Sequence, residues 1–333
     1  MARVGYLDCF SGASGDMILG ALVDAGLSPQ SLRAELAKLP LTGYRLSARK
    51  VQRASVAATQ VRVAVAKKQP PRRLADIVSI IEGGSLPATD KEKGVAIFRR
   101  LAKAEAKVHG SPLAEAHLHE VGAVDAIVDV MGAVAGLRLL GGEELFASAL
   151  ALGSGRTEGA ESALPVPAPA TLELVASAGA PTVAAQGGEE RELLTPTGAA
   201  IITTLARFQR PTMKVDGVGY GAGSRDVAGW PNVLRLWLGT TGEETRQLML
   251  LAETNIDDMS PEIVGYVQER LFASGAADVW LTPIQMKKGR PGVMLSVLCP
   301  VEAESAIVSV LLRETSTLGV RLREVRRQEA ERE

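Results

Sequence analysis

The sequence predicts a mixed α/β (α+β) fold in two domains. Its 333 residues exceed the usual size of one compact domain. The chain opens with a strand, a loop and a helix, and it closes with the βαββαβ order of a ferredoxin-like domain. The segment TTGEETR at 240–246 is polar and has no apolar period, so it separates the two patterns. We expect an N-terminal mixed α/β domain at 1–240 and a ferredoxin-like domain at 246–327.

The first domain is expected to begin with a buried strand, a small polar loop and a helix. Hydrophobic periodicity then indicates further helices, a hairpin and a proline break at Pro70 and Pro71. The expected elements are strand 3–7, helix 16–25, helix 28–38, hairpin strands 44–51 and 60–65, and helices 72–82 and 90–107. LPVPAPA, at 164–170, has proline at every second position, which favours extended backbone that leads into a helix.

The second domain has the clearer order of elements. Pro261 suits the first turn of a helix, and Gly275 suits its end. The expected elements are strand 247–256, helix 261–274, strands 277–286 and 292–299, helix 301–314 and strand 318–326. This βαββαβ succession is the ferredoxin-like split βαβ pattern.

Composition narrows the functional classes. Basic and acidic residues number 37 and 38, so the basic excess typical of a general nucleic-acid binder is absent. Cys9 and Cys299 lie far apart and form no CxxC pair, which disfavours a disulfide framework and a thiolate zinc site. No signal peptide and no run of eighteen apolar residues is seen. We expect a cytoplasmic protein that binds neither membrane nor nucleic acid.

The densest polar motif is HLHEVGAVDAIVDVMG, which begins at His117. His117 and His119 share a side only on extended backbone, and Glu120 follows them. Imidazole binds nickel, zinc and copper alike. A metal site is one interpretation, and a polar segment that enters a helix is the other.

The helix after this motif carries two aspartates away from its apolar stripe. Asp125 and Asp129 share a face with Gly122, Gly132 and Gly136. Glycine on a helix face permits close approach by a ligand or by another backbone. Tight helix packing with the aspartates at its edge explains the pattern equally well.

The loop DCFSGASGD is a candidate anion site, because backbone amides at a helix N-terminus bind anions. It contains Ser11, Gly12, Ser14 and Gly15, and it matches neither a Walker P-loop nor GxGxxG. Asp8 and Asp16 bracket the loop and are candidate cation ligands. Capping of the helix is the favoured role for Asp16. For Cys9, burial as a small apolar residue is favoured over metal binding.

Two further motifs are glycine-rich. In LLTPTGAA, Thr195 or Thr197 is expected to cap a helix whose free amides, Gly198 included, face a ligand, with Pro196 early in that helix. In VGYGAGSRD, alternate glycines from Gly217 to Gly223 lie on one side of an extended chain and would admit a ligand or another strand. A flexible turn is the alternative for the second motif.

The second domain has a candidate triphosphate site. Asp257 ends an alternating row of oxygen-bearing side chains on the first strand, and Asp258 follows it. Such oxygen ligands suit magnesium or manganese. The hairpin between the second and third strands of this domain contains Lys287, Lys288 and Arg290, which would meet the phosphates. A solvated turn is the alternative for this basic hairpin.

Taken together, the motifs resemble the LarC family, the nickel-insertion proteins of nickel-pincer cofactor biosynthesis. The resemblance runs from about residue 3 to residue 322 and rests on YLDCFSGASGDMILGAL, HLHEVGAVDAIVDVMG, LLTPTGAA, GYGAG, ETNIDDMSPE, TPIQMKKGRPG and ETSTLGVR. Family chains usually continue well past the last motif, whereas this sequence stops at Glu333. That difference bears on oligomerisation and on full activity.

The resemblance implies a chelatase that places Ni(II) into pyridinium-3,5-bisthiocarboxylic acid mononucleotide, the precursor of the lactate racemase cofactor. It also implies CTP with Mn(II) or Mg(II), a homo-oligomer and delivery to a lactate racemase-type apoenzyme. The nickel-handling residues it suggests are His117, His119, Glu120, Asp125, Asp8 and Asp16. The nucleotide residues it suggests are Asp257, Asp258, Lys287, Lys288 and Arg290.

Three other functions are consistent with parts of the pattern. The glycine loop and the carboxylate and lysine set suit an NTP-dependent phosphotransferase. A passive nickel chaperone would bind the metal without turnover. An RNA-binding module on the ferredoxin-like domain is disfavoured, because its strands lack paired aromatic residues.

Overall fold

The computed structural model describes residues 2–65, 72–113, 117–118, 123–142, 144–158, 163–184, 191–227, 229–241 and 247–327. The chain is mixed α/β and forms two compact units, Met1–Gly242 and Glu243–Glu333. Each unit is described by itself below. In the parts of the chain that the structure describes, no helix is both long and apolar enough to cross a lipid bilayer.

A mixed sheet is the framework of the first unit. Among the described residues its strands run in the order β11-β6-β1-β13-β12-β3-β2. Their bounds are Arg3–Asp8 (β1), Tyr44–Arg53 (β2), Val56–Val65 (β3), Glu144–Ala147 (β6), Ala206–Arg207 (β11), Lys214–Ala222 (β12) and Val233–Thr240 (β13). β6 is parallel to β1 and to β11, and β12 is parallel to β3, whereas the other neighbours are antiparallel. The predicted hairpin is confirmed as β2 and β3.

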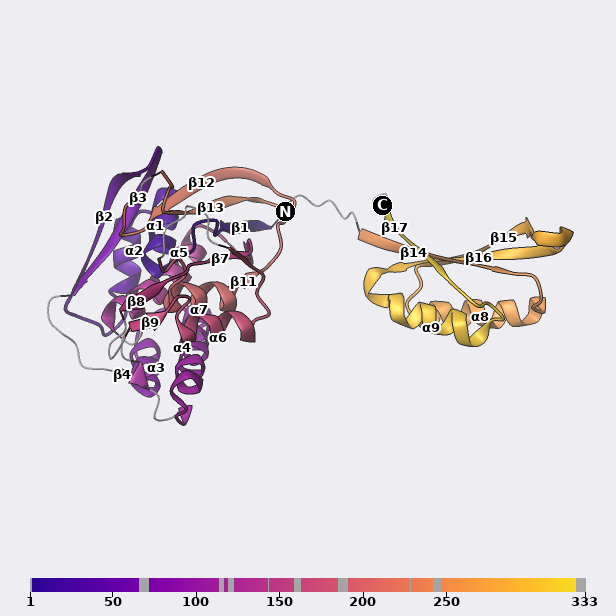
Figure 1. Ribbon diagram of the computed structural model, residues 1–333, viewed down its shortest axis with the longest axis horizontal. Coiled ribbons are helices and arrows are strands. Elements are labelled where there is room, and N and C mark those ends of the chain that lie inside the picture. The colour runs from indigo at the N-terminus through magenta and orange to yellow at the C-terminus, as the bar shows by residue number, and fades with distance from the viewer. Residues whose placement is uncertain are drawn as a thin grey trace. The chain divides into compact units, whose positions relative to one another are not determined.

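Helices gather on one side of this sheet, below β1, β12 and β13 in Figure 1. They are Gly15–Asp24 (α1), Pro29–Leu36 (α2), Leu74–Glu82 (α3), Ala88–His109 (α4), Val124–Leu139 (α5), Pro169–Ser177 (α6) and Pro196–Leu205 (α7). The remaining strands are Arg72–Arg73 (β4), His117–Leu118 (β5), Leu150–Leu152 (β7), Arg156–Glu158 (β8), Ala163–Pro165 (β9) and Thr182–Ala184 (β10). The pairs are β4 with β5, β7 with β10 and β8 with β9. The LPVPAPA segment therefore holds β9 and leads into α6, as expected.

Side-chain alternation divides the sheet into two faces. On the helix side, Leu7 of β1 and Leu236 of β13 belong to the main core together with α1, α5 and α7. On the outer side, Tyr6 of β1 belongs to a small separate apolar cluster that Trp237 of β13 packs against. The outer side is therefore partly apolar and is not part of the main core.

Helix α1 crosses the sheet at backbone distance. A Cβ on Gly221 of β12 would lie 1.8 Å from the Met17 carbonyl oxygen, and a Cβ on Gly219 would lie 2.1 Å from the Ala21 carbonyl oxygen. The glycine row at 217–223 was expected to admit a ligand or a strand. That expectation is wrong for Gly219 and Gly221, because helix α1 occupies the space. The alternative of a flexible turn is also wrong, since residues 214–222 form β12.

The glycines of α5 likewise serve helix packing. A Cβ on Gly132 would lie 2.9 Å from Leu19 Cδ2 of α1, and one on Gly136 would lie 2.9 Å from Leu22 Cδ1. Of the two interpretations left open for this helix face, close packing holds at these two positions. Gly122 lies outside the described residues.

The second unit is a four-stranded antiparallel sheet with two helices, counted over residues 247–327. Its elements are Gln247–Ile256 (β14), Pro261–Ala273 (α8), Asp278–Gln285 (β15), Pro291–Pro300 (β16), Glu304–Glu314 (α9) and Arg321–Arg327 (β17), with short 3₁₀ turns at Lys287–Gly289 and Val301–Ala303. The strand order is β15-β16-β14-β17. The core contains Leu271 of α8, Ile307 of α9 and Val297 of β16. The predicted succession of strands and helices is observed.

We predict that Gly221→Ala destabilises the first unit by about 3 kcal/mol, because the new methyl group would overlap the Met17 carbonyl and separate α1 from β12. Urea unfolding followed by circular dichroism measures the loss. Gly217→Ala on the same strand is the control, since its Cβ would meet only Leu238 at 3.7 Å. The control should change stability by no more than about 0.5 kcal/mol, and equal losses in the two variants would contradict the close approach of α1.

Candidate functional site

The structure brings two of the sequence motifs together. The Ala13 N–H donates to the Leu193 carbonyl (2.9 Å), and the Thr195 N–H donates to the Ala13 carbonyl (3.1 Å). Gly12 has a φ of +81°, and a Cβ there would lie 2.1 Å from the Leu193 carbonyl oxygen. Glycine is needed at this position for both its conformation and its close approach. Residues 9–15 of the first motif and residues 193–198 of the second therefore lie side by side. We refer to these two segments together as the loop region.

Two helices begin at this loop region. The Thr195 hydroxyl accepts a hydrogen bond from the Gly198 N–H (3.2 Å) at the start of α7, with Pro196 in its first turn. This confirms the predicted cap by Thr195 and places Thr197 inside the first turn. A Cβ on Gly198 would lie 2.4 Å from the Ala13 carbonyl oxygen, so the start of α7 lies against the start of α1. The first-turn amides of both helices are therefore near each other.

Helix α1 begins one residue earlier than expected, at Gly15. Its N-cap is Ser14, whose side chain makes no capping bond, so Asp16 is not the N-cap residue that the sequence favours. Asp16 instead lies in the first turn, where its carboxylate accepts hydrogen bonds from the Met17 N–H (2.9 Å) and the Ser14 hydroxyl. Burial raises the pKa of Asp16 despite these bonds.

A second carboxyl group lies beside the start of α1. A Cβ on Gly15 would lie 2.3 Å from Asp129 Oδ2 of α5. Burial, followed by the charges of Asp16 and Asp125, raises the pKa of Asp129 well above its ordinary value. Asp129 keeps some exposed surface, but its Oδ1 is shielded from solvent and has no hydrogen-bond partner among the described residues. The sequence pattern placed Asp129 near Asp125 but did not single it out as a site residue.

The charges of Asp16 and Asp125 both act on Asp129, so the three carboxyl groups lie near the first turns of α1 and α5. Asp125 is exposed in the first turn of α5, and its carboxylate accepts a hydrogen bond from the Ala126 N–H (3.0 Å). Carboxylates are favoured near helix N-termini by the helix dipole. Burial and the charges of Asp16 and Asp125 oppose the ionisation of Asp129.

The predicted histidines lie at the edge of what the structure describes. His117 is in β5, where its backbone pairs with Arg73 of β4, so it has the extended conformation that the HxH interpretation requires. His119 and Glu120 lie outside the described residues. Within the described ranges, no three His, Cys, Asp or Glu side chains are placed to hold a metal ion.

Asp8 and Cys9 have other partners. Asp8 accepts hydrogen bonds from the guanidinium of Arg235 on β13, at 3.1 Å from Nε and more closely from Nη2. Cys9 is fully buried, its N–H donates to the Ser148 hydroxyl (2.9 Å), and burial raises the pKa of its thiol to about 12. Because a thiol with that pKa is neutral at ordinary pH, Cys9 has the character of a buried apolar residue.

In the second unit, the predicted nucleotide residues lie close together. The strand β14 ends at Ile256, so Asp257 lies just beyond the ladder, and its carboxylate is 3.6 Å from the Arg290 guanidinium. Lys287 and Lys288 form the 3₁₀ turn before Arg290, with Lys288 at a φ of +61°. All three basic side chains are exposed.

The ETSTLGVR motif also reaches this place. The Ser316 hydroxyl donates to the Asp258 carboxylate, and the Thr254 hydroxyl donates to the Gly319 carbonyl (3.0 Å). In the sequence, this motif contributes only to the family resemblance. Its position beside Asp258 adds Ser316 to the candidate residues, and no spacing rule in the sequence indicates that contact.

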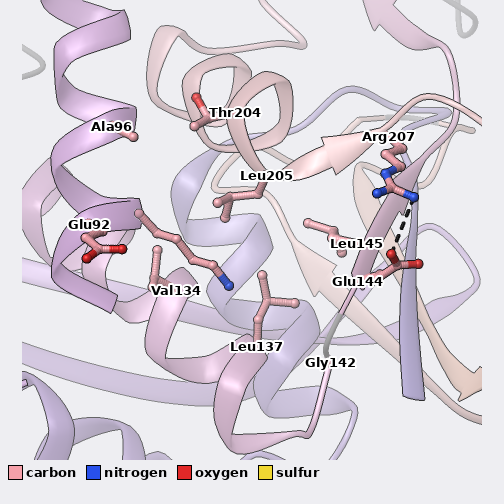
Figure 2. Close-up of a pocket in the computed structure, with 11 residues that line it drawn as sticks. Glu92, Ala96, Val134, Leu137, Gly142, Glu144, Leu145, Thr204, Leu205 and Arg207 are labelled. Atoms are coloured by element: carbon pink, nitrogen blue, oxygen red, sulfur yellow. Dashed lines mark ion pairs between the residues drawn. The ribbon is translucent and has the colours of Figure 1, made fainter. Parts of the chain in front are cut away.

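The hollow shown in Figure 2 lies elsewhere in the first unit. It has a volume of about 470 Å³ and is bounded by Glu92 near the start of α4, Leu137 near the end of α5, and Leu205 at the end of α7. Glu144 and Arg207 form an ion pair at one side (3.4 Å). None of the predicted site residues lines it, because α5 and α7 begin at the loop region and end at this hollow.

Comparison with known proteins identifies the family. A family model described as nickel insertion protein matches residues 5–333. A putative nickel insertion protein of Roseiflexus castenholzii is 50% identical over 337 residues, covering 100% of this chain and 85% of the relative. A pyridinium-3,5-bisthiocarboxylic acid mononucleotide nickel insertion protein of Desulfitobacterium hafniense (strain DSM 10664 / DCB-2) is 47% identical over 329 residues, covering 96% and 81%.

One solved structure is also similar in sequence. It is described as LarC2, the C-terminal domain of a cyclometallase involved in the synthesis of the NPN cofactor of lactate racemase, in its apo form. It is 43% identical, covers 24% of this chain and 56% of its own, and has a TM-score of 0.24. From the full-length matches, the chain belongs to the family of nickel insertion proteins, the LarC family that its sequence motifs indicate.

Proposed function

We propose that this protein inserts Ni(II) into pyridinium-3,5-bisthiocarboxylic acid mononucleotide and so completes a nickel-pincer cofactor. The observation that carries the proposal is the family match over residues 5–333, which includes a relative named for this substrate. The convergence of the loop 9–15, the segment 193–198 and the start of α5 supports it, because it gathers anion-binding amides and carboxyl groups in one place.

The nickel ion is a substrate in this reaction. We assign its handling to His117, His119, Glu120, Asp125 and Asp16, since imidazole and carboxylate together suit a metal that must later be released. Asp8 contributes to nickel binding only when its hydrogen bonds with the Arg235 guanidinium are broken. Asp129 joins the set as a further carboxyl group beside Asp16.

Insertion requires a proton acceptor. When nickel bonds to the ring carbon, that carbon loses its proton, so one proton leaves for each metal–carbon bond formed. We assign the proton to His117, His119 or Glu120, which are general bases of suitable strength. Because the pKa of Asp129 is raised, this carboxyl group resists ionisation beside the first loop, and this favours binding of the mononucleotide phosphate there.

We assign the phosphate of the mononucleotide to the amides and hydroxyls at the starts of α1 and α7. The residues are Ser11, Gly12, Ser14, Gly15, Thr195, Thr197 and Gly198. Backbone N–H groups in the first turn of a helix lack the partner four residues earlier, and the helix dipole favours an anion there. The Gly12 N–H, which donates to the Cys9 carbonyl (3.0 Å), and the Gly198 N–H, which donates to the Thr195 hydroxyl (3.2 Å), would exchange these bonds for bonds to the phosphate.

We propose further that the second unit is a ferredoxin-like domain that binds CTP with Mn(II) or Mg(II) and forms a homo-oligomer. Its strand order and antiparallel pairing support the fold. Asp257 and Asp258 would supply oxygen ligands suited to the cation, and Lys287, Lys288 and Arg290 would meet the phosphates. The Arg290 guanidinium, 3.6 Å from the Asp257 carboxylate, supports this assignment. Transfer of the product to a lactate racemase-type apoenzyme in the cytoplasm completes the proposal.

The central prediction is nickel-dependent conversion of the mononucleotide. Purified protein is incubated with nickel, CTP, manganese and the bisthiocarboxylate mononucleotide, and mass spectrometry detects the gain of nickel and the loss of a proton.

His117→Ala combined with His119→Ala should abolish nickel binding, measured by equilibrium dialysis. His109→Ala is the control, because this third histidine lies on α4 beside Glu105 (3.6 Å).

Nickel binding without conversion by the wild-type protein would instead identify a passive carrier. Phosphate transfer from CTP without nickel would identify a phosphotransferase. Wild-type nickel affinity in the double histidine variant would contradict the ligand assignment.

Nucleotide binding is tested separately. Asp257→Ala and Lys288→Ala should each weaken CTP binding in the presence of manganese by about tenfold, since each removes a charged contact to the metal or to a phosphate. Isothermal titration calorimetry measures the affinity. Asp278→Ala, at the other end of the β15–β16 pair, should leave it unchanged. Unaltered affinity in the first two variants would place the nucleotide elsewhere.

The raised pKa of Asp129 predicts a pH-dependent stability. Below the unfolded-state pKa of about 3.9 the group is protonated in both states and has no effect. As the pH rises above that value, the unfolded state ionises more readily, so Asp129 destabilises the fold. Asp129→Asn should therefore raise the thermal midpoint at pH 7.5 and leave it nearly unchanged at pH 3.5. A variant that is equally destabilised at both pH values would contradict burial as the cause.

A further inference from the structure

Aromatic side chains gather on the outer side of the sheet, away from the helices. The whole chain has only 5 Phe, 4 Tyr and 3 Trp. Tyr6 of β1 pairs across the strands with Trp237 of β13, and their ring centroids are 5.1 Å apart. Phe10, directly after β1, lies 5.9 Å from Trp230 in an edge-on arrangement. We refer to Tyr6, Phe10, Trp230 and Trp237 as the aromatic platform.

Two arginines lie over this platform. The Arg235 guanidinium is 5.0 Å from the centroid of Phe10 and 5.8 Å from that of Trp237. Asp8 holds it from the neighbouring strand. Arg210 lies 4.8 Å over Trp237 and forms no ion pair within the described residues. The platform thus combines flat apolar rings with planar cations.

This composition is unusual for the open side of a sheet. A face that meets only water normally carries polar side chains that alternate with the buried ones. Here Tyr6 is buried, whereas Trp230, Trp237 and Phe10 are partly exposed. The Trp230 Nε1–H is shielded from solvent without an acceptor among the described residues, and a shielded donor without a partner costs about 1–3 kcal/mol.

The platform adjoins the loop region in sequence. Phe10 directly precedes Ser11, and Asp8 and Cys9 connect β1 to the glycine loop. A ligand that reached from the amides of this loop to the platform would therefore need an anionic end and a flat aromatic end. A pyridinium mononucleotide has both.

We propose that the aromatic platform stacks against the planar ring of a pyridinium mononucleotide, while Arg235 and Arg210 pair with the acidic groups on that ring. A positively charged ring is attracted to the faces of Trp and Phe. Guanidinium groups match carboxylates and thiocarboxylates in plane and in charge. The identity of the ligand rests on the function proposed above, whereas the platform itself rests on the contacts described here.

The probe is pyridinium-3-carboxylic acid mononucleotide, added without nickel to the full-length protein. Calorimetry should show that Phe10→Leu weakens binding about tenfold through lost stacking. Arg210→Ala, at an exposed position whose loss leaves the fold intact, should weaken it about three- to fivefold. Trp280→Phe, on β15 of the second unit, is the matched aromatic control and should bind normally.

Fluorescence gives an independent measurement, because two of the three tryptophans belong to the platform. The mononucleotide should quench the emission of the wild-type protein and of Trp280→Phe to a similar extent. If quenching came from Trp280, or if Phe10→Leu and Arg210→Ala bound the probe as well as the wild type, the platform would be wrong.

The two proposals fail in different ways. Binding to the platform without any nickel insertion into the bisthiocarboxylate compound would reject the proposed function and leave the platform in place. Normal nickel insertion with an unchanged KM for the mononucleotide in Phe10→Leu and Arg210→Ala would reject the platform and leave the function in place.

Discussion

The contact between helix α1 and strand β12 determines where the candidate site lies. Gly219 and Gly221 have no side chains, so the carbonyl groups of Met17 and Ala21 approach the strand backbone directly. Gly20 on the helix side is equally close, since a Cβ there would lie 2.4 Å from the Thr59 carbonyl oxygen of β3. This contact fixes the direction of α1 and holds its first turn against the segment 193–198. Larger side chains at these glycines would move the helix and open the loop region.

Two opposing electrostatic effects act at the loop region, one that favours anions and one that favours cations. The helix dipoles at the starts of α1 and α7 favour anions, whereas the carboxyl groups of Asp16, Asp125 and Asp129 attract cations. Burial raises the pKa of Asp16, and burial together with the charges of Asp16 and Asp125 raises the pKa of Asp129, so these two carboxyl groups resist ionisation. A site that must take up both a metal cation and a phosphate-bearing organic anion has use for such a balance. Asp8, on the outer side, is balanced differently, by the guanidinium of Arg235.

The two faces of the sheet in the first unit have different roles. The helix side forms the main core and positions the first turns of the helices, whereas the outer side carries the aromatic platform. In the second unit, hydrogen bonds between the ETNIDDM and ETSTLGVR motifs place Asp258 beside Ser316, and an ion pair places Arg290 beside Asp257. Motifs that are far apart in the chain therefore meet in pairs in each unit.

By itself, the sequence determined the elements and the family. Periodicity located the helices of both units and the strands of the second unit to within a few residues, because buried stripes repeat at 3.6 or 2 residues wherever one side faces a core. In the first unit it located β1, β2 and β3 but left most of the later strands unassigned. It indicated Thr195 or Thr197 at a helix start and Gly275 at a helix end, since local hydrogen bonding decides such positions. Its long motifs indicated the nickel insertion family, which the comparisons establish.

Only the tertiary structure decided which of these residues meet. The glycines of β12 suited a ligand, a strand or a helix equally in sequence, and the helix α1 fills the space. Asp8 and Asp16 bracket one loop, yet Asp8 pairs with Arg235, which is 227 positions away in the chain. Asp129, Ser316 and the aromatic platform carry no local signal, because their partners come from distant strands and helices. Local pattern determines backbone conformation, whereas burial, pairing and the raised pKa of a carboxyl group depend on long-range packing.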